Sequence, residues 1–195
     1  MTPADDLTTT LGGAVAGLGP RQVRLVPHDP AWAPAFAREA ARLRQGLGRH
    51  ALAVEHIGST AVPGLAAKPI LDLMVATPAL KPALELESLL AGLGYAHRPL
   101  DTIPGRLLFV GNAGDLRLVN LSLTEPGSVF WRDHLAFRDR LRADPALAAA
   151  YTRLKAQLAA QFPGDRLAYT AAKDAFVAAA LAAPEPTPGH ASMWI

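Results

Sequence analysis

The chain has 195 residues, half of them hydrophobic, and a formal net charge of only +2. This length corresponds to one domain with a sizeable core. The small charge does not favour binding to duplex nucleic acid, although it is compatible with an anionic small ligand. The chain contains no cysteine, which excludes disulfides, thiol nucleophiles and zinc–thiolate sites and fits a reducing cytoplasm. No apolar run approaches the ~20 residues that span a membrane, and no signal peptide is evident, so we expect a cytoplasmic protein with no membrane partner.

Both ends of the chain are expected to be disordered. Residues 1–20 are small, rich in threonine and glycine, and lack a helical period. Residues 184–195 begin with PEPTP, a proline-rich stretch that disfavours regular structure. The ordered domain is therefore predicted to run over residues 21–183.

Within this domain, hydrophobic periodicity predicts a mixed sheet with helices packed on it. An N-cap at Asp29 and Pro30 at the first helical position begin an amphipathic helix over 30–47. A second helix is predicted over 82–93, and three more close the domain over 129–143, 145–161 and 165–182. Short apolar runs predict strands over 22–26, 51–57, 69–76, 95–98, 106–111 and 116–124, the last two joined by a turn at 111–114. Because the helices cluster toward the C-terminus, the fold class is α+β.

The segment VEHIGSTAVPGLAAKPILDLMVA, residues 54–76, carries most of the functional information. A Gly58-Ser59-Thr60 turn follows one predicted strand, and Asp72 stands isolated inside the next. The glycine permits close approach of backbone to a phosphate, which the serine hydroxyl and free N–H groups bind. The carboxylate is suited to hold Mg²⁺ on such phosphates. The alternatives are an ordinary turn with a serine cap, and a salt bridge from Asp72 to Lys68 or Arg117.

Three stretches resemble the GrpB family: EHIGSTAVPGLAAKPILDLMV, then IPGRLLFV, then HLAFRDRLRADPALAAAYTRLKAQLAAQFPGDRLAYTAAKDAFV. The resemblance covers roughly residues 22–180 in the same motif order. It implies a nucleotidyltransferase-like mixed sheet flanked by helices, and a nucleotide or phosphate site. Members of the family occur alone and fused to dephospho-CoA kinase. The resemblance does not supply a substrate.

Carried over from the family, the Gly-Ser motif falls on Gly58 and Ser59 and the strand acid on Asp72. The basic positions fall on Lys68, Arg106 and Arg117, and the helix motif HL-x-FRD includes His134 and Arg138. The sequence departs from the family where a His-apolar-His pattern is usual, because Asn120 and Ser122 stand there. Period-two spacing places both on one strand face. As weak neutral ligands, they indicate either a lost metal site or a pocket reused for hydrogen bonding.

The remaining candidates each have a functional and a structural interpretation. A two-metal mechanism would need a second acid, and because Met74 stands two residues after Asp72, Glu55 is the nearest candidate, or else a residue that only faces solvent. His56 is a candidate base, or a histidine packed at a strand end. Lys68, Arg106, Arg117 and Arg138 are candidate phosphate contacts, or solvated and salt-bridged groups. We expect His134 to be packed in the core, on the stripe that carries Phe130 and Phe137. Alanine-rich faces over 146–160 and 171–182 are helix-packing surfaces or a homodimer face.

These residues support three functions. The leading hypothesis is binding of a nucleotide or phosphorylated small molecule, with Mg²⁺-dependent nucleotidyl transfer if Asp72 holds the metal. The second is a binding or scaffold module without chemistry, motivated by Met74 and by the Asn120 and Ser122 replacements. The third is a metal-free enzyme that uses the altered pocket on a small metabolite.

Overall fold

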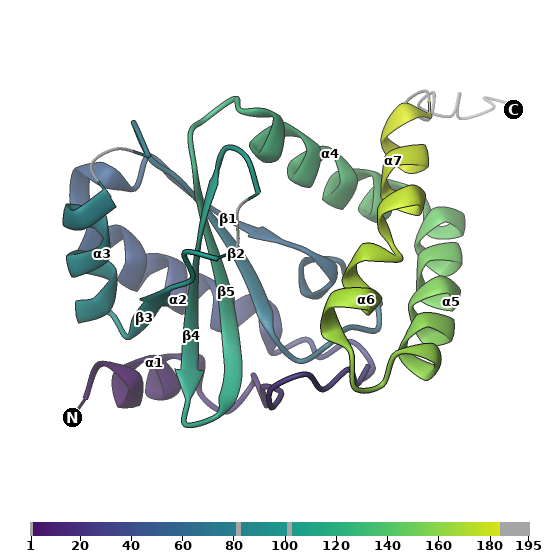
Figure 1. Ribbon diagram of the computed structural model, residues 1–195, viewed down its shortest axis with the longest axis horizontal. Coiled ribbons are helices and arrows are strands. Elements are labelled where there is room, and N and C mark those ends of the chain that lie inside the picture. The colour runs from purple at the N-terminus through teal and green to yellow at the C-terminus, as the bar shows by residue number, and fades with distance from the viewer. Residues whose placement is uncertain (1, 81–82, 101–102, 184–195) are drawn as a thin grey trace, which may run out of the picture.

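A computed structural model describes residues 2–80, 83–100 and 103–183, shown as a ribbon in Figure 1. Its helices are α1 (Pro3–Leu11), α2 (Trp32–Leu47), α3 (Ala83–Gly92), α4 (Val129–Ala143), α5 (Pro145–Gln161), α6 (Arg166–Ala171) and α7 (Asp174–Ala182), with short 3-10 turns η1 (Gly48–His50) and η2 (Ser59–Ala61). Its strands are β1 (Ala53–Ile57), β2 (Leu71–Ala76), β3 (Tyr95–His97), β4 (Arg106–Ala113) and β5 (Leu116–Thr124). None of the helices in these ranges has the length and apolar character that a membrane crossing requires.

The five strands form one mixed sheet in the order β1-β2-β5-β4-β3. Only the central pair, β2 and β5, runs parallel; the other three pairs are antiparallel. In this register Asp72 lies beside Ile57 of β1 and Asn120 of β5. The predicted α+β fold with a mixed sheet and flanking helices is confirmed.

Helices cover the sheet unequally on its two faces. α1, α2 and α3 pack with the sheet into the main core, which contains buried leucines and valines of β2 and β5. α2 forms because its apolar residues recur at helical spacing, and they bury one stripe; Trp32, Ala40, Leu43 and Leu47 are all at most 2% exposed. On the other face a smaller cluster of Ile57, Met74 and Phe130 attaches the start of α4. α5, α6 and α7 extend beyond α4 at one side of the molecule (Figure 1).

The prediction of a disordered segment over residues 1–20 is wrong for its described part. Residues Pro3–Leu11 form α1, which begins with a capping box between Thr2 and Asp5. Leu7 and Leu11 are spaced by one helical turn and are 0% and 1% exposed. Leu7 packs against Gly111 of β4, where a Cβ would come within 2.4 Å of its Cδ2. Burial of these leucines against the sheet supplies the stability that local propensity lacks. The predicted segment over 184–195 lies outside the described residues.

Three smaller predictions also need correction. The expected strand over 22–26 reduces to one bridge, between Val26 and Ala67. The expected last helix over 165–182 is divided into α6 and α7 by a turn at residues 172–173. The turn predicted over 111–114 begins later, because β4 continues to Ala113 and β5 begins at Leu116.

Candidate functional site

A large open cleft lies between one face of the sheet and the C-terminal helices. Its volume is about 1690 Å³, and its walls include β2, β4, β5, the η2 turn and residues of α4 to α7. The predicted residues in its lining are Gly58, Ser59, Thr60, Lys68, Asp72, Arg106, Arg117, Asn120, Ser122 and Arg138. The fold therefore gathers side chains that are up to 80 residues apart in sequence, from Gly58 to Arg138, around one space.

The Gly58-Ser59 turn lies directly against Asp72. Gly58 has a φ of 70° and a ψ of −171°, a conformation open almost only to glycine. A Cβ at Gly58 would lie 2.5 Å from Oδ2 of Asp72, so the position also requires the absence of a side chain. The hydroxyl of Thr60 faces the interior, where it is bonded to Nε2 of His56 at 2.9 Å. The hydroxyl of Ser59, by contrast, is bonded to Lys155 of α5, which also lines the cleft.

Asp72 is linked to the basic residues of the cleft through an amide. Nδ2 of Asn120 donates to Oδ1 of Asp72 at 2.8 Å, and Nη1 of Arg117 donates to Oδ1 of Asn120 at 2.9 Å. Nε of Arg117 donates to Oδ1 of Asn112 at 3.1 Å. Asn120 and Ser122 both line the cleft, and Asn120 lies directly beside Asp72 in the parallel pair of β2 and β5. Asn120 therefore serves as a hydrogen-bond bridge between Asp72 and Arg117.

Two lysines lie against Tyr169 of α6. Nζ of Lys68 is 5.2 Å from the centroid of the Tyr169 ring, and Nζ of Lys173 is 4.7 Å from it. Burial, followed by the charge of Lys173, lowers the pKa of Lys68 to about 8. Burial also lowers the pKa of Lys173, and the nearby Asp72 carboxylate opposes that shift. These ammonium groups are poorly solvated and repel one another, and a bound anion would stabilise both charges.

Two arginines extend this positive region. Burial, followed by the charge of Arg166, lowers the pKa of Arg117 to about 10, and burial lowers the pKa of Arg166 as well. Nη2 of Arg166 donates to the carbonyl of Gly19 at 3.0 Å. Arg106 lies further along the sheet face, with its guanidinium carbon 5.3 Å from the centroid of the Phe130 ring. The cleft is therefore lined by lysines and arginines along much of its length, with Asp72 among the aspartates that also line it.

The prediction that Glu55 and His56 act beside Asp72 is corrected by their positions, since neither lines the cleft. His56 is stacked on Phe36 of α2, with ring centroids 4.7 Å apart, because alternate residues of β1 point to opposite faces. Burial, followed by the charges of Arg142 and Arg138, lowers the pKa of His56 to about 4. Glu55 is paired with Arg138, whose Nη1 donates to its Oε2 at 2.7 Å.

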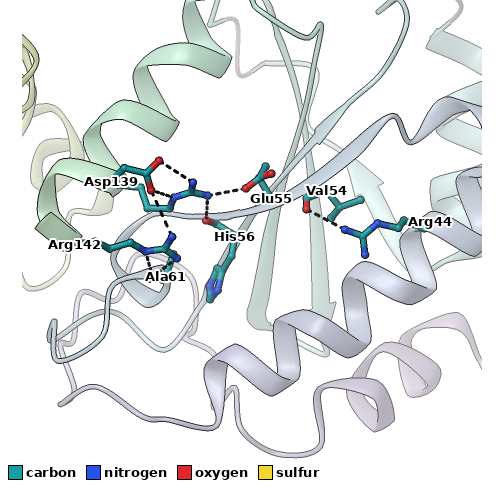
Figure 2. A network of polar contacts seen from close by, with 8 residues as sticks. Arg44, Val54, Glu55, His56, Ala61, Asp139 and Arg142 are labelled. Atoms are coloured by element: carbon teal, nitrogen blue, oxygen red, sulfur yellow. Dashed lines mark hydrogen bonds and ion pairs between the residues drawn. The ribbon is translucent and has the colours of Figure 1, made fainter.

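These arginines attach α4 to β1 and to the η2 turn (Figure 2). Arg138 also donates to the backbone oxygen of His56 at 3.1 Å. Arg142 donates two bonds to the carbonyl of Ala61, at 3.0 and 2.8 Å. Arg138 therefore borders the cleft while its donors bond to β1, and Arg142 bonds to the η2 turn. His134 is stacked on Phe130, with ring centroids 3.9 Å apart, but it is half-buried and also lines the cleft, so it is not enclosed in the core.

The residues present do not fit the expected magnesium site. Mg²⁺ is held in proteins by one or two carboxylates together with waters and ligand phosphates. Met74 occupies the place of a second acid and is 0% exposed, and an amide N–H of Asn120 points at Asp72. Across residues 2–80, 83–100 and 103–183, no group of three or more His, Asp or Glu side chains is placed to hold a metal ion. The surrounding lysines and arginines favour an anion at this position rather than a divalent cation.

Sequence reasoning missed several residues that the C-terminal helices bring to the cleft: Lys155, Arg166, Tyr169 and Lys173. The last three are spaced by three and four residues, a spacing that would predict one helical face, although in the structure Lys173 lies in the turn between α6 and α7. That spacing was the available signal. Lys155 had no such signal, because it lies within an alanine-rich stretch that is typical of helix packing.

The fold and the cleft define an α+β protein with a mixed sheet and a basic, glycine-bordered site. Residues 22–183 match the model of the GrpB protein family, and the chain belongs to that family. It is 34% identical over 157 residues to the UPF0157 protein YqkA of Bacillus subtilis, which covers 80% of this chain and 46% of that protein. It is 37% identical over 165 residues to a UPF0157 protein of Pseudomonas aeruginosa, covering 80% of this chain and 65% of that protein.

Among solved structures, the fold is similar to the crystal structure of the conserved protein GrpB from Enterococcus faecalis. The TM-score is 0.73 at 35% identity, covering 80% of this chain and 94% of that chain. The chain thus spans about half of the Bacillus relative and nearly all of the Enterococcus chain. The recognised family is confirmed by these matches.

Proposed function

We propose that this protein binds a nucleotide or another phosphorylated small molecule in the basic cleft, through direct contacts with lysine and arginine side chains. The observation that carries this proposal is the pair Lys68 and Lys173, both held against Tyr169 and both with a pKa lowered by burial. Burial disfavours the charged form of both lysines, and a phosphate between them would stabilise their ammonium groups. The cleft is also large enough for a ligand of nucleotide size.

Asp72 and its bridge to Arg117 have a defined part in this proposal. Asp72 is one of several aspartates in the lining, and Asn120 donates the hydrogen bond that orients its carboxylate. This carboxylate would accept a hydrogen bond from a hydroxyl or amine of the ligand, such as those of a ribose or a base. The phosphate would lie toward the lysines, and the neutral part of the ligand toward β2 and β5.

Nucleotidyl transfer dependent on Mg²⁺ is the finer function that the family resemblance implies. It needs acids that hold the metal on the phosphates, and this chain offers Asp72 with Met74 and Asn120 beside it. Binding therefore has more support in the residues than transfer does.

A thermal-shift screen tests the proposal. Nucleotides, coenzyme A precursors and phosphorylated sugars would be added with Mg²⁺ and with EDTA. A ligand at ~100 times its dissociation constant should add ~2.7 kcal/mol of stability. We expect a hit in EDTA that weakens at least tenfold in Lys173→Met and is partly restored in Lys173→Arg.

The matched control is Arg153→Met, because Arg153 is an exposed cation on α5 outside the cleft. It should leave affinity unchanged. Equal affinity in wild type and Lys173→Met would contradict binding by the lysines. A hit that disappears in EDTA and in Asp72→Asn would instead favour the metal-dependent transferase.

A further inference from the structure

A buried lysine of α5 is bonded to the serine of the Gly58-Ser59 turn. Nζ of Lys155 lies 3.0 Å from Oγ of Ser59, and it also contacts the carbonyl of Ala66. Lys155 is 1% exposed. Tyr151, one helical turn earlier, is also in hydrogen-bond contact with Ser59 and places its ring centroid 4.9 Å from Nζ. Ser59 is half-buried and borders the cleft, so its hydroxyl is held between two side chains and the space where a ligand binds.

The environment of Lys155 shifts it toward the neutral amine relative to a solvated lysine. Burial, followed by the nearby Lys173 ammonium, lowers the pKa of Lys155 to about 7. Lys173 faces it from the start of α7 and Tyr151 from its own helix. Asp72, on β2, acts on Tyr151 and on Lys173. A lysine of this kind is a base poised near neutral pH, unlike a solvated lysine.

We propose that Ser59 and Lys155 form a nucleophile and general-base pair for acyl transfer from an ester that carries an anionic group. A serine hydroxyl is a weak nucleophile until an adjacent base takes its proton, and lysine serves as that base in several unrelated hydrolases. Here the two groups come from distant segments of the chain and meet at the edge of a basic cleft. Tyr151 is the positioning residue that orients the hydroxyl.

The proposed step balances without metal or redox chemistry. Oγ of Ser59 attacks the ester carbonyl carbon, and its proton moves to Nζ of Lys155. The carbon–oxygen bond of the ester then breaks, the proton passes from Lys155 to the departing alkoxide, and an acyl-serine remains. A water molecule, deprotonated by Lys155, hydrolyses the acyl-serine and returns the pair to its starting state. Ester and water give carboxylic acid and alcohol.

The choice of an anionic ester rests on the proposed function, because Lys68 and Lys173 are the groups that would bind its charge. The reactivity of Ser59 does not depend on that part of the inference. The two claims can therefore fail separately.

A fluorophosphonate tests the reactivity, since such reagents form an Oγ–phosphorus bond with activated serines and release fluoride. We expect the full-length protein to be labelled at Ser59, as located by peptide mass mapping, and Ser59→Ala to abolish the label. Lys155→Met should reduce the labelling rate at least tenfold, with the fold checked by circular dichroism. If Lys155→Met does not fold, Lys155→Arg serves, because arginine stays protonated and cannot act as the base.

Ser88→Ala is the matched control, because Ser88 is an exposed serine on α3 outside the cleft. It should label like wild type. In wild type the rate should rise with pH and level off above an apparent pKa of about 7, the value of Lys155. Absence of label on the folded wild type, a label that persists in Ser59→Ala, or an unchanged rate in the folded Lys155 variant would overturn the pair.

Substrate class is tested with 4-nitrophenyl esters that have an acidic or a neutral acyl chain. We expect faster release of nitrophenolate from the acidic ester, and loss of this preference in Lys173→Met while Ser59 remains labelled. Equal rates for the two esters, with Ser59 labelled, would overturn the anionic substrate class and leave the serine–lysine pair in place.

Discussion

Asn120 donates from Nδ2 to Asp72 at 2.8 Å and accepts from Arg117 at 2.9 Å. One amide thus joins the acid of β2 to a cation of β5. A histidine at this position would instead present a ring nitrogen as a metal ligand. With asparagine here, the Asp72 carboxylate is instead a member of a hydrogen-bonded chain that ends on a cation.

Restoring the family pattern should create a metal site. In the double variant Asn120→His, Ser122→His, two imidazoles would lie on the strand face beside Asp72, because the residues are two apart on β5. We expect the double variant to bind Zn²⁺ or Ni²⁺ at least tenfold more tightly than wild type, as measured by titration calorimetry. Ser122→His alone is the control and should gain little. No gain in the double variant would mean that the Asp72 side chain remains engaged elsewhere.

The close approach of Gly58 to Asp72 predicts a specific loss of stability. Gly58→Ala introduces a Cβ 2.5 Å from Oδ2 of Asp72 at a φ of 70°. Gly64→Ala has a similar φ of 77° but open space around the Cβ. The left-handed conformation should cost roughly 1–3 kcal/mol at either position, and the contact should make Gly58→Ala the larger loss. Chemical denaturation measures both, and equal losses would show that Asp72 moves aside freely.

Hydrophobic spacing predicted the parts of this fold that are locally consistent. The stripe from Trp32 to Leu47 gave α2, and the apolar runs gave β1 to β5 with end shifts of one or two residues. Over residues 1–20 the apolar pattern was too short to predict a helix. Only Leu7 and Leu11 are buried in α1, and the three residues between them are threonines. Their helix is stable because Leu7 packs in the space that the missing side chain of Gly111 leaves. No local sequence pattern predicts such a long-range contact.

The candidate site divides in the same way. Gly58, Ser59 and Asp72 were found because they share one short segment around β2. Lys155 is 96 residues from Ser59 in the sequence, so its hydrogen bond depends on how α5 packs against the turn. His56 was misplaced because adjacent strand residues point to opposite faces, and the sequence did not say which face would border the cleft. Glu55 is on the same face as Asp72, opposite Met74, but it is paired with Arg138 of α4, a contact between distant segments that the sequence does not reveal.

The packing of α1 gives a prediction that separates a docked helix from a disordered tail. Leu7→Ala should reduce the free energy of unfolding by ~2–5 kcal/mol, because Leu7 is 0% exposed in the main core. Thr9→Ala is the control on the same helix, where the side chain is exposed. Urea denaturation compares the two. A loss for Leu7→Ala no larger than for Thr9→Ala would contradict the docked position of α1.

The buried lysine predicts a dependence of stability on pH. In the unfolded chain Lys155 keeps its proton up to pH ~10.4, whereas its pKa in the folded protein is about 7. Between these values the unfolded state binds more protons, so raising the pH through this window stabilises the folded state, and lowering it reverses the gain. Each pKa unit corresponds to ~1.4 kcal/mol.

Lys155→Met removes this titration and should flatten the rise in stability between pH 7 and pH 10, relative to wild type. Lys68 and Lys173, which also have lowered pKa values, are present in both proteins, so the difference between the two curves reports the titration of Lys155 together with its coupling to Lys173. Thermal unfolding in matched buffers measures it, with Arg153→Met as the exposed control that should keep the wild-type slope. Parallel curves for wild type and Lys155→Met would show that Lys155 remains charged in the folded protein across this range, and would remove the basis for its action as a proton acceptor.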